Sequence, residues 1–296
     1  MLHHVSRRCV SRRFLLLPDP EVLELIAYCM GVAAKRLNIS ILSLMVMGNH
    51  YHIIYLDNDG RSPDFLEWVN RMLTLGLQRI RKKQGYAFSG SAFDRGSSFS
   101  DQIIDSPEGL RAATRYLMTN PVSARLSKNP CHWQGFVSKP GVQGIEARRP
   151  YWMTDQSGPE KETLHFSKPP ETMLPAEAAE MSYEAYCQKE LEEAVRDARA
   201  ALRREGKHHF KPLRKVMQVS PLSSPKTTVK RGNMSELLRR ACAVGASQVH
   251  AFLKSFREAY RTALTLYQSG NKKVVFPDGT WRMRVMFGCQ VAGCPS

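Results

Sequence analysis

Apolar residues recur at helical spacing in three stretches of the first half of the chain. The stretches follow Asp19, Ser62 and Ser106, and a proline comes directly after each of these residues. A capping side chain followed by proline is typical of a helix N-terminus. We therefore expect helices that begin near residues 20, 63 and 107, and we expect the third to end before Pro121.

Apolar runs between these helices predict strands. They cover residues 4–17, 39–47 and 99–104, with a shorter run at 93–95, and the run at 39–47 leads directly into a second apolar segment at 50–55. The resulting order of strand, helix, strand, helix, strands and helix predicts an α+β sandwich, with helices against a mostly antiparallel sheet.

The second half of the chain has a different composition. Residues 140–175 are rich in Pro, Gly, Ser and Lys, which predicts a linker between a first domain at 1–139 and a basic, mainly helical C-terminal extension at 176–296. Within the extension we expect helices at 177–205, 235–244 and 247–268. A hairpin with its turn at 277–280 is expected to follow.

The net charge and the lengths of the apolar runs indicate which partners and which compartment to expect. The 296 residues include 43 Lys and Arg against 27 Asp and Glu, a net charge of +16 that is typical of proteins that bind a phosphate backbone. A basic soluble surface without such a partner is the alternative. No run approaches the roughly 20 apolar residues of a membrane span, and the apolar run at 14–17 is shorter than the about 7–15 residues of a signal-peptide core. We expect a cytoplasmic, nucleoid-associated protein with no membrane partner.

Two pairs of residues carry candidate chemistry. His50 and His52 are one residue apart, so on a strand they share a face while Tyr51 points to the other. Tyr116 and Asn120 are four apart, so on a helix they also share a face. Each pair has an ordinary structural explanation as well, because histidines pack in cores and an asparagine before proline can simply end a helix.

Together the two pairs suit phosphoryl transfer through a covalent intermediate. Two imidazoles and one oxygen ligand can hold a divalent cation that polarises a scissile phosphate. A nearby tyrosine oxygen can then attack phosphorus. The product is a phosphotyrosine bond to one DNA end and a free hydroxyl on the other, and this step is reversible because the new bond conserves the energy of the phosphodiester.

At these residues the chain resembles the single-tyrosine transposases with a His-hydrophobic-His (HUH) motif. Residues 47–54 resemble that motif, and residues 116–122, with their Asn-Pro-Val ending, resemble the tyrosine helix. The segments at 133–136 and 4–7 are most similar to the REP-associated tyrosine transposases. The resemblance covers roughly residues 1–139. It departs from the family pattern at Gly48, where proline is usual, and at Tyr51, where an aliphatic residue is usual.

The resemblance implies a ferredoxin-like sandwich with a central antiparallel sheet and helices on one side, followed here by the helical extension. It also implies Mg²⁺ or Mn²⁺ as cofactor, and nicking and rejoining of single-stranded DNA next to hairpins through a 5′-phosphotyrosine. By position, His50 and His52 are expected metal ligands and Tyr116 the nucleophile. Asn120 is expected to be the third ligand or to orient that ligand.

The expected partners are single-stranded or hairpin DNA, with a homodimer as one compatible state. Candidate DNA contacts are the basic residues of the first strand, the second helix and the third helix: Arg7, Arg8, Arg12, Arg79, Arg81, Lys82 and Arg115. On the second helix the alternative is that the cations only complement the helix C-terminus. Two other functions stay open, a DNA-binding protein that has lost cleavage and a replication or mobilisation relaxase.

Overall fold

The computed structural model describes residues 1–94, 99–207, 209–226, 246–277, 280, 283–284 and 287–292 of the chain. The chain forms two compact units, Met1–Val229 and Lys230–Ser296. The division therefore lies far beyond residue 139, where the composition predicted the end of the first domain.

The first unit is built on a four-stranded antiparallel sheet. Its strands are β1 (Leu2–Arg8), β2 (Ile39–Val46), β3 (His50–Asp57) and β4 (Phe99–Ile104), in the spatial order β2-β3-β1-β4. Helix α1 (Pro20–Arg36) connects β1 to β2, and helix α2 (Ser62–Lys83) connects β3 to β4. This order and connectivity are ferredoxin-like, which confirms the α+β class and the central antiparallel sheet.

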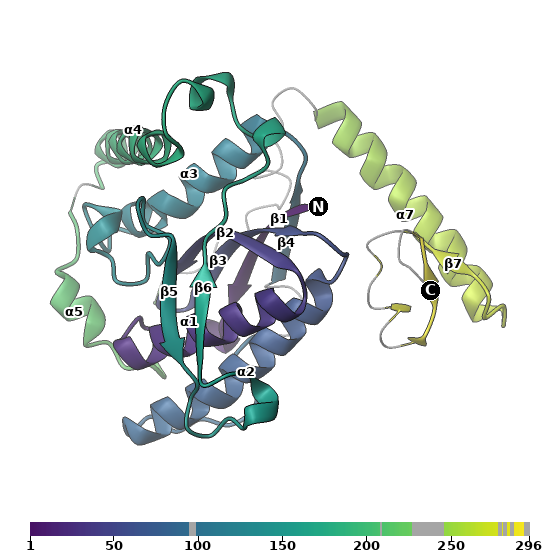
Figure 1. Ribbon diagram of the computed structural model, residues 1–296, viewed down its shortest axis with the longest axis horizontal. Coiled ribbons are helices and arrows are strands. Elements are labelled where there is room, and N and C mark those ends of the chain that lie inside the picture. Colours follow the sequence, from purple (N-terminus) through teal and green to yellow (C-terminus); the bar gives the residue numbers. More distant parts are fainter. Residues whose placement is uncertain are drawn as a thin grey trace. The chain divides into compact units, whose positions relative to one another are not determined.

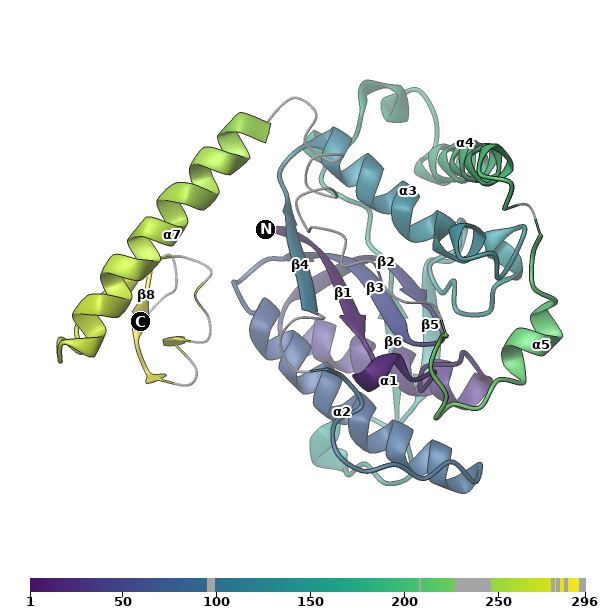
Figure 2. The same ribbon diagram turned by 180° about the vertical axis from the view of Figure 1, so that it is seen from behind.

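Helices cover both faces of this sheet. Helices α1 and α2 pack on one face, in a core that includes Val5, Tyr51 and Ile53. Helix α3 (Pro107–Ser123) packs on the opposite face with Leu2 and Ile54, and α4 (Tyr183–Arg204) lies against α3 (Figures 1 and 2). The expectation of helices on one side is therefore wrong for α3. The physical reason is that β3 carries apolar side chains on both of its faces, and each face needs a cover.

Two element boundaries also differ from the sequence expectation. The first strand ends at Arg8 instead of continuing to residue 17, because Ser11 and Arg12 adopt left-handed backbone angles with φ of 51° and 59°. The third helix continues past Pro121 to Ser123, since a proline so near the C-terminus removes only one backbone donor. The predicted caps at Asp19 and Ser106 are confirmed, because both side chains accept a backbone N–H of the first helical turn.

The segment expected to be a linker is packed into the first unit. Strands β5 (Gly144–Arg148) and β6 (Lys161–His165) pair antiparallel, and Leu164 is fully buried in the same core as α1. Gly31 of α1 allows this approach, since a Cβ there would lie 3.2 Å from the backbone of β6. The remaining short elements of this unit are the helix α5 (Leu213–Met217) and the 3₁₀ turns Val10–Arg12, Pro130–His132, Asp155–Ser157, Glu171–Met173 and Ala176–Ala179.

The second unit has its own small core. Helix α7 (Ala246–Gln268) confirms the expected helix at 247–268, and the buried Phe276 of β7 (Val275–Phe276) packs against Tyr260 and Tyr267. Strand β7 pairs in parallel with β8 (Gln290–Val291). The expected hairpin is thus not the pairing found for β7. Part of its turn, and the whole predicted helix at 235–244, lie outside the described residues.

One candidate DNA contact turns out to hold the fold together. Arg81 is 1% exposed, and its guanidinium donates to the carbonyl oxygens of Leu15 and Leu17 and to Asp19 Oδ2 at 2.6 Å. It therefore ties α2 to the segment between the first strand and α1. The expectation that Arg81 contacts DNA is wrong, because its donors are already used inside the protein.

Replacing Arg81 tests this structural role. Arg81→Met keeps an apolar stem but leaves two buried carbonyls and a carboxylate without their donor, so we expect a loss of about 3 kcal/mol in the free energy of unfolding. Urea denaturation measures it. The neighbouring Lys82→Met removes an exposed side chain and should shift stability by less than about 0.5 kcal/mol. Equal effects of the two substitutions would contradict the role given to Arg81.

Candidate metal and nucleophile site

The end of β2 is clamped by the segment 133–136, directly before the chain turns into the histidine pair. The Trp133 indole donates to the Val46 carbonyl at 2.8 Å, and the Val46 N–H donates to the Gly135 carbonyl. A Cβ on Gly135 would lie 1.8 Å from the Val46 oxygen, so this close approach requires glycine. The clamp sets where the following turn, and hence His50, is placed.

His50 and His52 lie on the face of β3 that α3 covers. Their ring centroids are 4.9 Å apart. Tyr51 points to the opposite face, where it is fully buried and donates to Asn70 Oδ1, so the predicted alternation of this strand is confirmed. The histidine pair is therefore held by a buried aromatic anchor behind it.

Helix α3 brings Tyr116 and Asn120 to the same place. The Tyr116 ring lies 5.3 Å from the His52 ring between centroids, and Asn120 Nδ2 lies 3.1 Å from His52 Nε2. Tyr116 is 40% exposed, whereas Asn120 is buried. The four residues predicted from two separate motifs thus meet in one cluster, and Tyr116 is its exposed member.

A third imidazole belongs to this cluster. His4 of β1 places its Nε2 3.3 Å from His52 Nδ1, and its ring centroid lies 6.0 Å from that of Tyr116. In the sequence, His4 belongs to the segment 4–7 that resembles the REP-associated tyrosine transposases, and no role was predicted for it. The signal that finds it is the register of β1 against β3, which pairs Ser6 with His52 and so turns His4 to the same face.

The hydrogen bonds define which imidazole nitrogens are available. His50 Nδ1 bonds to Asn49 Oδ1 at 2.7 Å, and His52 Nδ1 bonds to His4 Nε2. In both residues Nδ1 is thus engaged, and His52 Nε2 faces Asn120. An imidazole whose Nδ1 carries the proton presents a lone pair at Nε2, which is the arrangement that a cation requires.

Burial keeps these imidazoles neutral. It lowers the pKa of His50 to about 4, with Arg8 acting in the same direction, and it lowers the pKa of His4 to about 4. The pKa of His52 falls well below its usual value because of burial and then of the two neighbouring histidines. Burial raises the pKa of Tyr116, against the opposing effects of Asn120 and Arg8. At neutral pH the histidines are therefore unprotonated and the tyrosine keeps its proton.

The donors present suit a divalent cation with open positions. Across the parts of the chain that the structure describes, no three His, Cys, Asp or Glu side chains gather as a metal-binding group. The available donors are the two imidazoles and, after a half-turn of its amide, the oxygen of Asn120. Such a set leaves coordination positions for water or phosphate oxygens, as a catalytic rather than a structural site does.

Of the remaining candidate DNA contacts, Arg8 and Arg12 lie next to the histidines. Both line a cavity of about 500 Å³ that also includes His50. The others lie elsewhere. Arg7 is half-buried on the Tyr51 side of the sheet, and Lys82 is exposed at the end of α2. Arg79 stacks on the Trp152 ring at 4.6 Å. Arg115 forms ion pairs with three acidic residues of α4, Glu190, Glu193 and Asp197.

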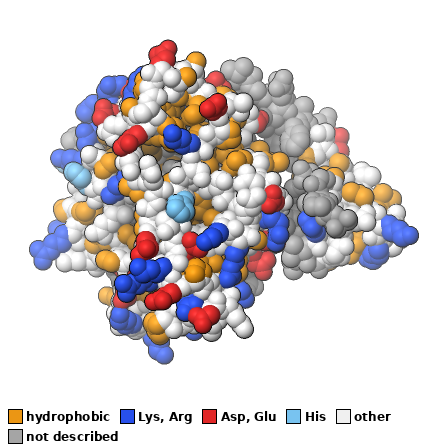
Figure 3. All heavy atoms as spheres, in the orientation of Figure 1, with side chains coloured by type: hydrophobic (Ala, Val, Ile, Leu, Met, Phe, Trp, Pro, Cys, Tyr) orange, Lys and Arg blue, Asp and Glu red, His pale blue; other side chains and the backbone are white. Residues whose placement is uncertain are grey.

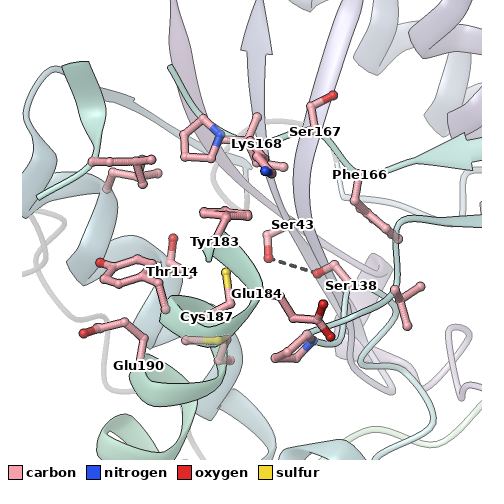
Figure 4. A pocket seen from close by; sticks show the side chains of 18 of the residues that line it. Ser43, Thr114, Ser138, Phe166, Ser167, Lys168, Tyr183, Glu184, Cys187 and Glu190 are labelled. Atoms are coloured by element: carbon pink, nitrogen blue, oxygen red, sulfur yellow. Dashed lines mark hydrogen bonds between the residues drawn. The ribbon is translucent and has the colours of Figure 1, made fainter. Parts of the chain in front are cut away.

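A second cavity, of about 550 Å³, lies on the other side of α3 and contains none of the predicted site residues. Figure 4 shows Tyr183, Cys187 and Glu190 of α4 along one wall and the hydrogen-bonded pair Ser43 and Ser138 along another. Its buried carboxylate, Glu190, is neutralised by Arg111 at 2.6 Å. This cavity therefore shares no residue with the histidine and tyrosine cluster.

Charge is mixed on the face of the molecule that Figure 3 shows. On the face shown in Figure 3, Lys and Arg side chains are interspersed with Asp and Glu side chains. None of the described helices is both long and apolar enough to cross a membrane.

Two of the three comparisons with known proteins give no match. No family model matches the chain, and no curated protein matches it. Among solved structures, a REP-associated tyrosine transposase bound to a REP hairpin is similar at 15% sequence identity and a TM-score of 0.36, over 45% of this chain and 73% of that one. Similarity at this level does not assign the chain to a family.

The neutral imidazoles make stability depend on pH. Between about pH 6.5 and pH 4 the unfolded chain binds protons that the folded His4 does not, so the free energy of unfolding should fall as the pH is lowered through this window. The shift for His4 corresponds to about 3 kcal/mol. Thermal melts of metal-free protein between pH 7 and pH 4.5 measure the slope.

The His4→Gln variant should show a shallower slope than the wild type, because glutamine does not titrate. The exposed His165 serves as a control, and His165→Gln should keep the wild-type slope. An unchanged slope in His4→Gln would show that another group causes the pH dependence.

Proposed function

We propose that this protein is a metal-dependent endonuclease and transposase that nicks and rejoins single-stranded DNA next to hairpins. The observation that carries the proposal is the position of Tyr116, whose partly exposed ring lies 5.3 Å from that of His52. A tyrosine next to paired neutral imidazoles and a buried amide suits covalent phosphoryl transfer. The net charge of +16 suits a nucleic-acid substrate.

In the proposed step, the Tyr116 oxygen forms a bond to phosphorus and the bond from phosphorus to the 3′-oxygen breaks. The phenolic proton passes to solvent, which reaches the partly exposed ring, and the leaving 3′-oxygen takes up a proton. Bound Mg²⁺ or Mn²⁺ supplies charge stabilisation for the phosphate. The chain's own part is to keep the imidazoles of His50 and His52 neutral and oriented through Asn49 and His4.

Substitution of Tyr116 tests the nucleophile. Incubation of the wild type with single-stranded hairpin DNA and Mn²⁺ should give a covalent protein–DNA band on denaturing gels. Tyr116→Phe should abolish the band, because only the attacking oxygen is removed, and it should leave DNA affinity within about twofold. Tyr151 is 91% exposed and belongs to no part of the site, so Tyr151→Phe should keep the wild-type band.

A band that persists in Tyr116→Phe would mean that another side chain attacks. A wild type that binds the hairpin with Mn²⁺ but never forms a band would support the alternative of a silent DNA-binding protein.

Substitution of His50 tests the metal role. His50→Ala removes one of two imidazole donors, so we expect Mn²⁺ affinity, measured by calorimetry without DNA, to fall at least about tenfold and the covalent band to disappear. Hairpin affinity in EDTA should change little, because the phosphate contacts remain. His165→Ala, far from the site in sequence and exposed, should leave both quantities unchanged. A parallel loss of DNA binding in His50→Ala would argue for a structural role instead.

A further inference from the structure

The cavity beside His50 has an unusual lining. Its charged side chains include five cations, Arg8, Arg12, Arg125, Lys211 and Lys215, and none of the described residues that line it is Asp or Glu. The rest of the wall is largely apolar and includes Phe14, Met47 and Val216. Cations beside apolar surface are the combination that proteins use to hold unpaired nucleotides, the cations for phosphates and the apolar wall for the base.

The size of the cavity limits what it can hold. A volume of about 500 Å³ lies in the range of small-ligand pockets, so it suits a single unpaired nucleotide rather than a duplex. Its wall joins distant parts of the chain, from the turn after β1, the start of β3 and the residues after α3 to the segment around α5.

Tyr116 and this cavity lie on opposite sides of the histidine pair. Along α3, Tyr116 contacts His4 and His52, and one turn later Asn120 contacts His52. Ala124 and Arg125, which directly follow the end of α3, line the cavity.

The strands give the same order. The register of β1 against β3 places Ser6 opposite His52 and Arg8 opposite His50, and of these residues Arg8 and His50 line the cavity. Both α3 and the strand pair therefore run from the tyrosine, past the histidines, to the cavity.

The geometry of phosphoryl transfer limits which nucleotide of the substrate can occupy the cavity. The attacking and leaving oxygens lie roughly in line on opposite sides of phosphorus. With Tyr116 on one side of the histidine pair, the leaving 3′-oxygen faces the other side, where the cavity opens. We propose that this cavity binds the nucleotide on the 5′ side of the scissile phosphate, the one that carries the leaving 3′-oxygen. This assignment rests on the proposed function.

The arrangement has a mechanistic consequence. After cleavage the 3′-hydroxyl strand has no covalent bond to the protein, so only non-covalent contacts can keep it in place. A pocket that holds its terminal nucleotide keeps that hydroxyl near the phosphotyrosine. Rejoining is the reverse attack, in which the 3′-oxygen bonds to phosphorus and the tyrosine oxygen leaves and regains a proton. Retention in the cavity raises the effective concentration of that hydroxyl.

A photocrosslinking experiment tests the occupant and its polarity. The probe is a short single-stranded oligonucleotide of mixed sequence with a free 3′-hydroxyl, which mimics the released strand, and it carries 4-thiothymidine at either its 3′-terminal or its 5′-terminal nucleotide. The full-length Tyr116→Phe protein is used so that no cleavage occurs. We expect the 3′-terminal label to crosslink to peptides that contain Arg125 or residues 211–219, and the 5′-terminal label to crosslink elsewhere. Crosslinks to these peptides from the 5′-terminal label alone, or from neither label, would overturn the assignment.

Two charge variants measure the contribution of the cavity. Lys211 and Lys215 are exposed on its rim, so the double variant Lys211→Ala/Lys215→Ala should fold normally, which a thermal melt checks. We expect it to bind the 3′-hydroxyl oligonucleotide about tenfold more weakly in fluorescence anisotropy at low salt. The matched variant Lys35→Ala/Lys161→Ala removes the same charge from exposed positions on α1 and β6, and it should bind within about twofold of the parent. Equal losses in the two variants would show that only net charge matters and would overturn the assignment.

Failure of this inference and failure of the proposed function give different results. Crosslinks in the cavity without any covalent band from the wild type on hairpin DNA would leave a nucleotide-binding pocket without the proposed chemistry. A covalent band without cavity crosslinks would leave the chemistry and reject the pocket.

Discussion

The structure of the site depends on one constraint, the two-residue alternation of side chains along β3. Tyr51, Ile53 and Tyr55 point into the core beneath α1 and α2, so His50 and His52 must point to the opposite face. The hydrogen bond from Tyr51 to Asn70 fixes this orientation from behind. A shift of one residue in the pairing would place the imidazoles in the apolar core beneath α1 and α2 and would take the Tyr51 hydroxyl away from Asn70, and both changes are energetically costly. The register of the strand is thus protected by the same packing that presents the imidazoles.

Helix α3 completes the site because it packs on the face of the sheet that carries the histidines and leaves Tyr116 partly exposed. Its apolar residues Leu110, Leu117 and Met118 pack on the sheet, while Tyr116 and Asn120 reach the imidazoles. Burial beneath α3 is the main cause that lowers the pKa of these histidines, and it keeps their imidazoles neutral at neutral pH. Ion pairs between α3 and α4, such as Arg115 with Asp197, hold the helix from its other side. Packing and electrostatics therefore support the same arrangement.

The basic residues of the first unit serve different purposes, which the net charge alone does not reveal. Arg81 binds backbone carbonyls in the interior, Arg115 is neutralised by acidic residues of α4, and Arg79 stacks on Trp152. Arg8 instead lines the cavity beside His50, together with lysines from the segment around α5. Positive charge is thus concentrated in the cavity beside His50, where the released strand is proposed to lie. The proposed nucleotide site depends on this local arrangement and not on the overall excess of cations.

The sequence by itself determined the local elements and the two motifs. The caps at Asp19 and Ser106, the alternation around Tyr51 and the helical spacing of Tyr116 and Asn120 are consequences of short-range geometry, so they could be read from neighbouring residues. Only the tertiary structure decided what long-range pairing controls. It placed His4 next to His52 through the register of β1, and it buried Arg81. It also packed the expected linker onto α1. Arg8 and the two lysines Lys211 and Lys215, about 200 residues apart in sequence, line the same cavity. No local pattern encodes these contacts, because each depends on which strands and helices become neighbours after the chain has folded.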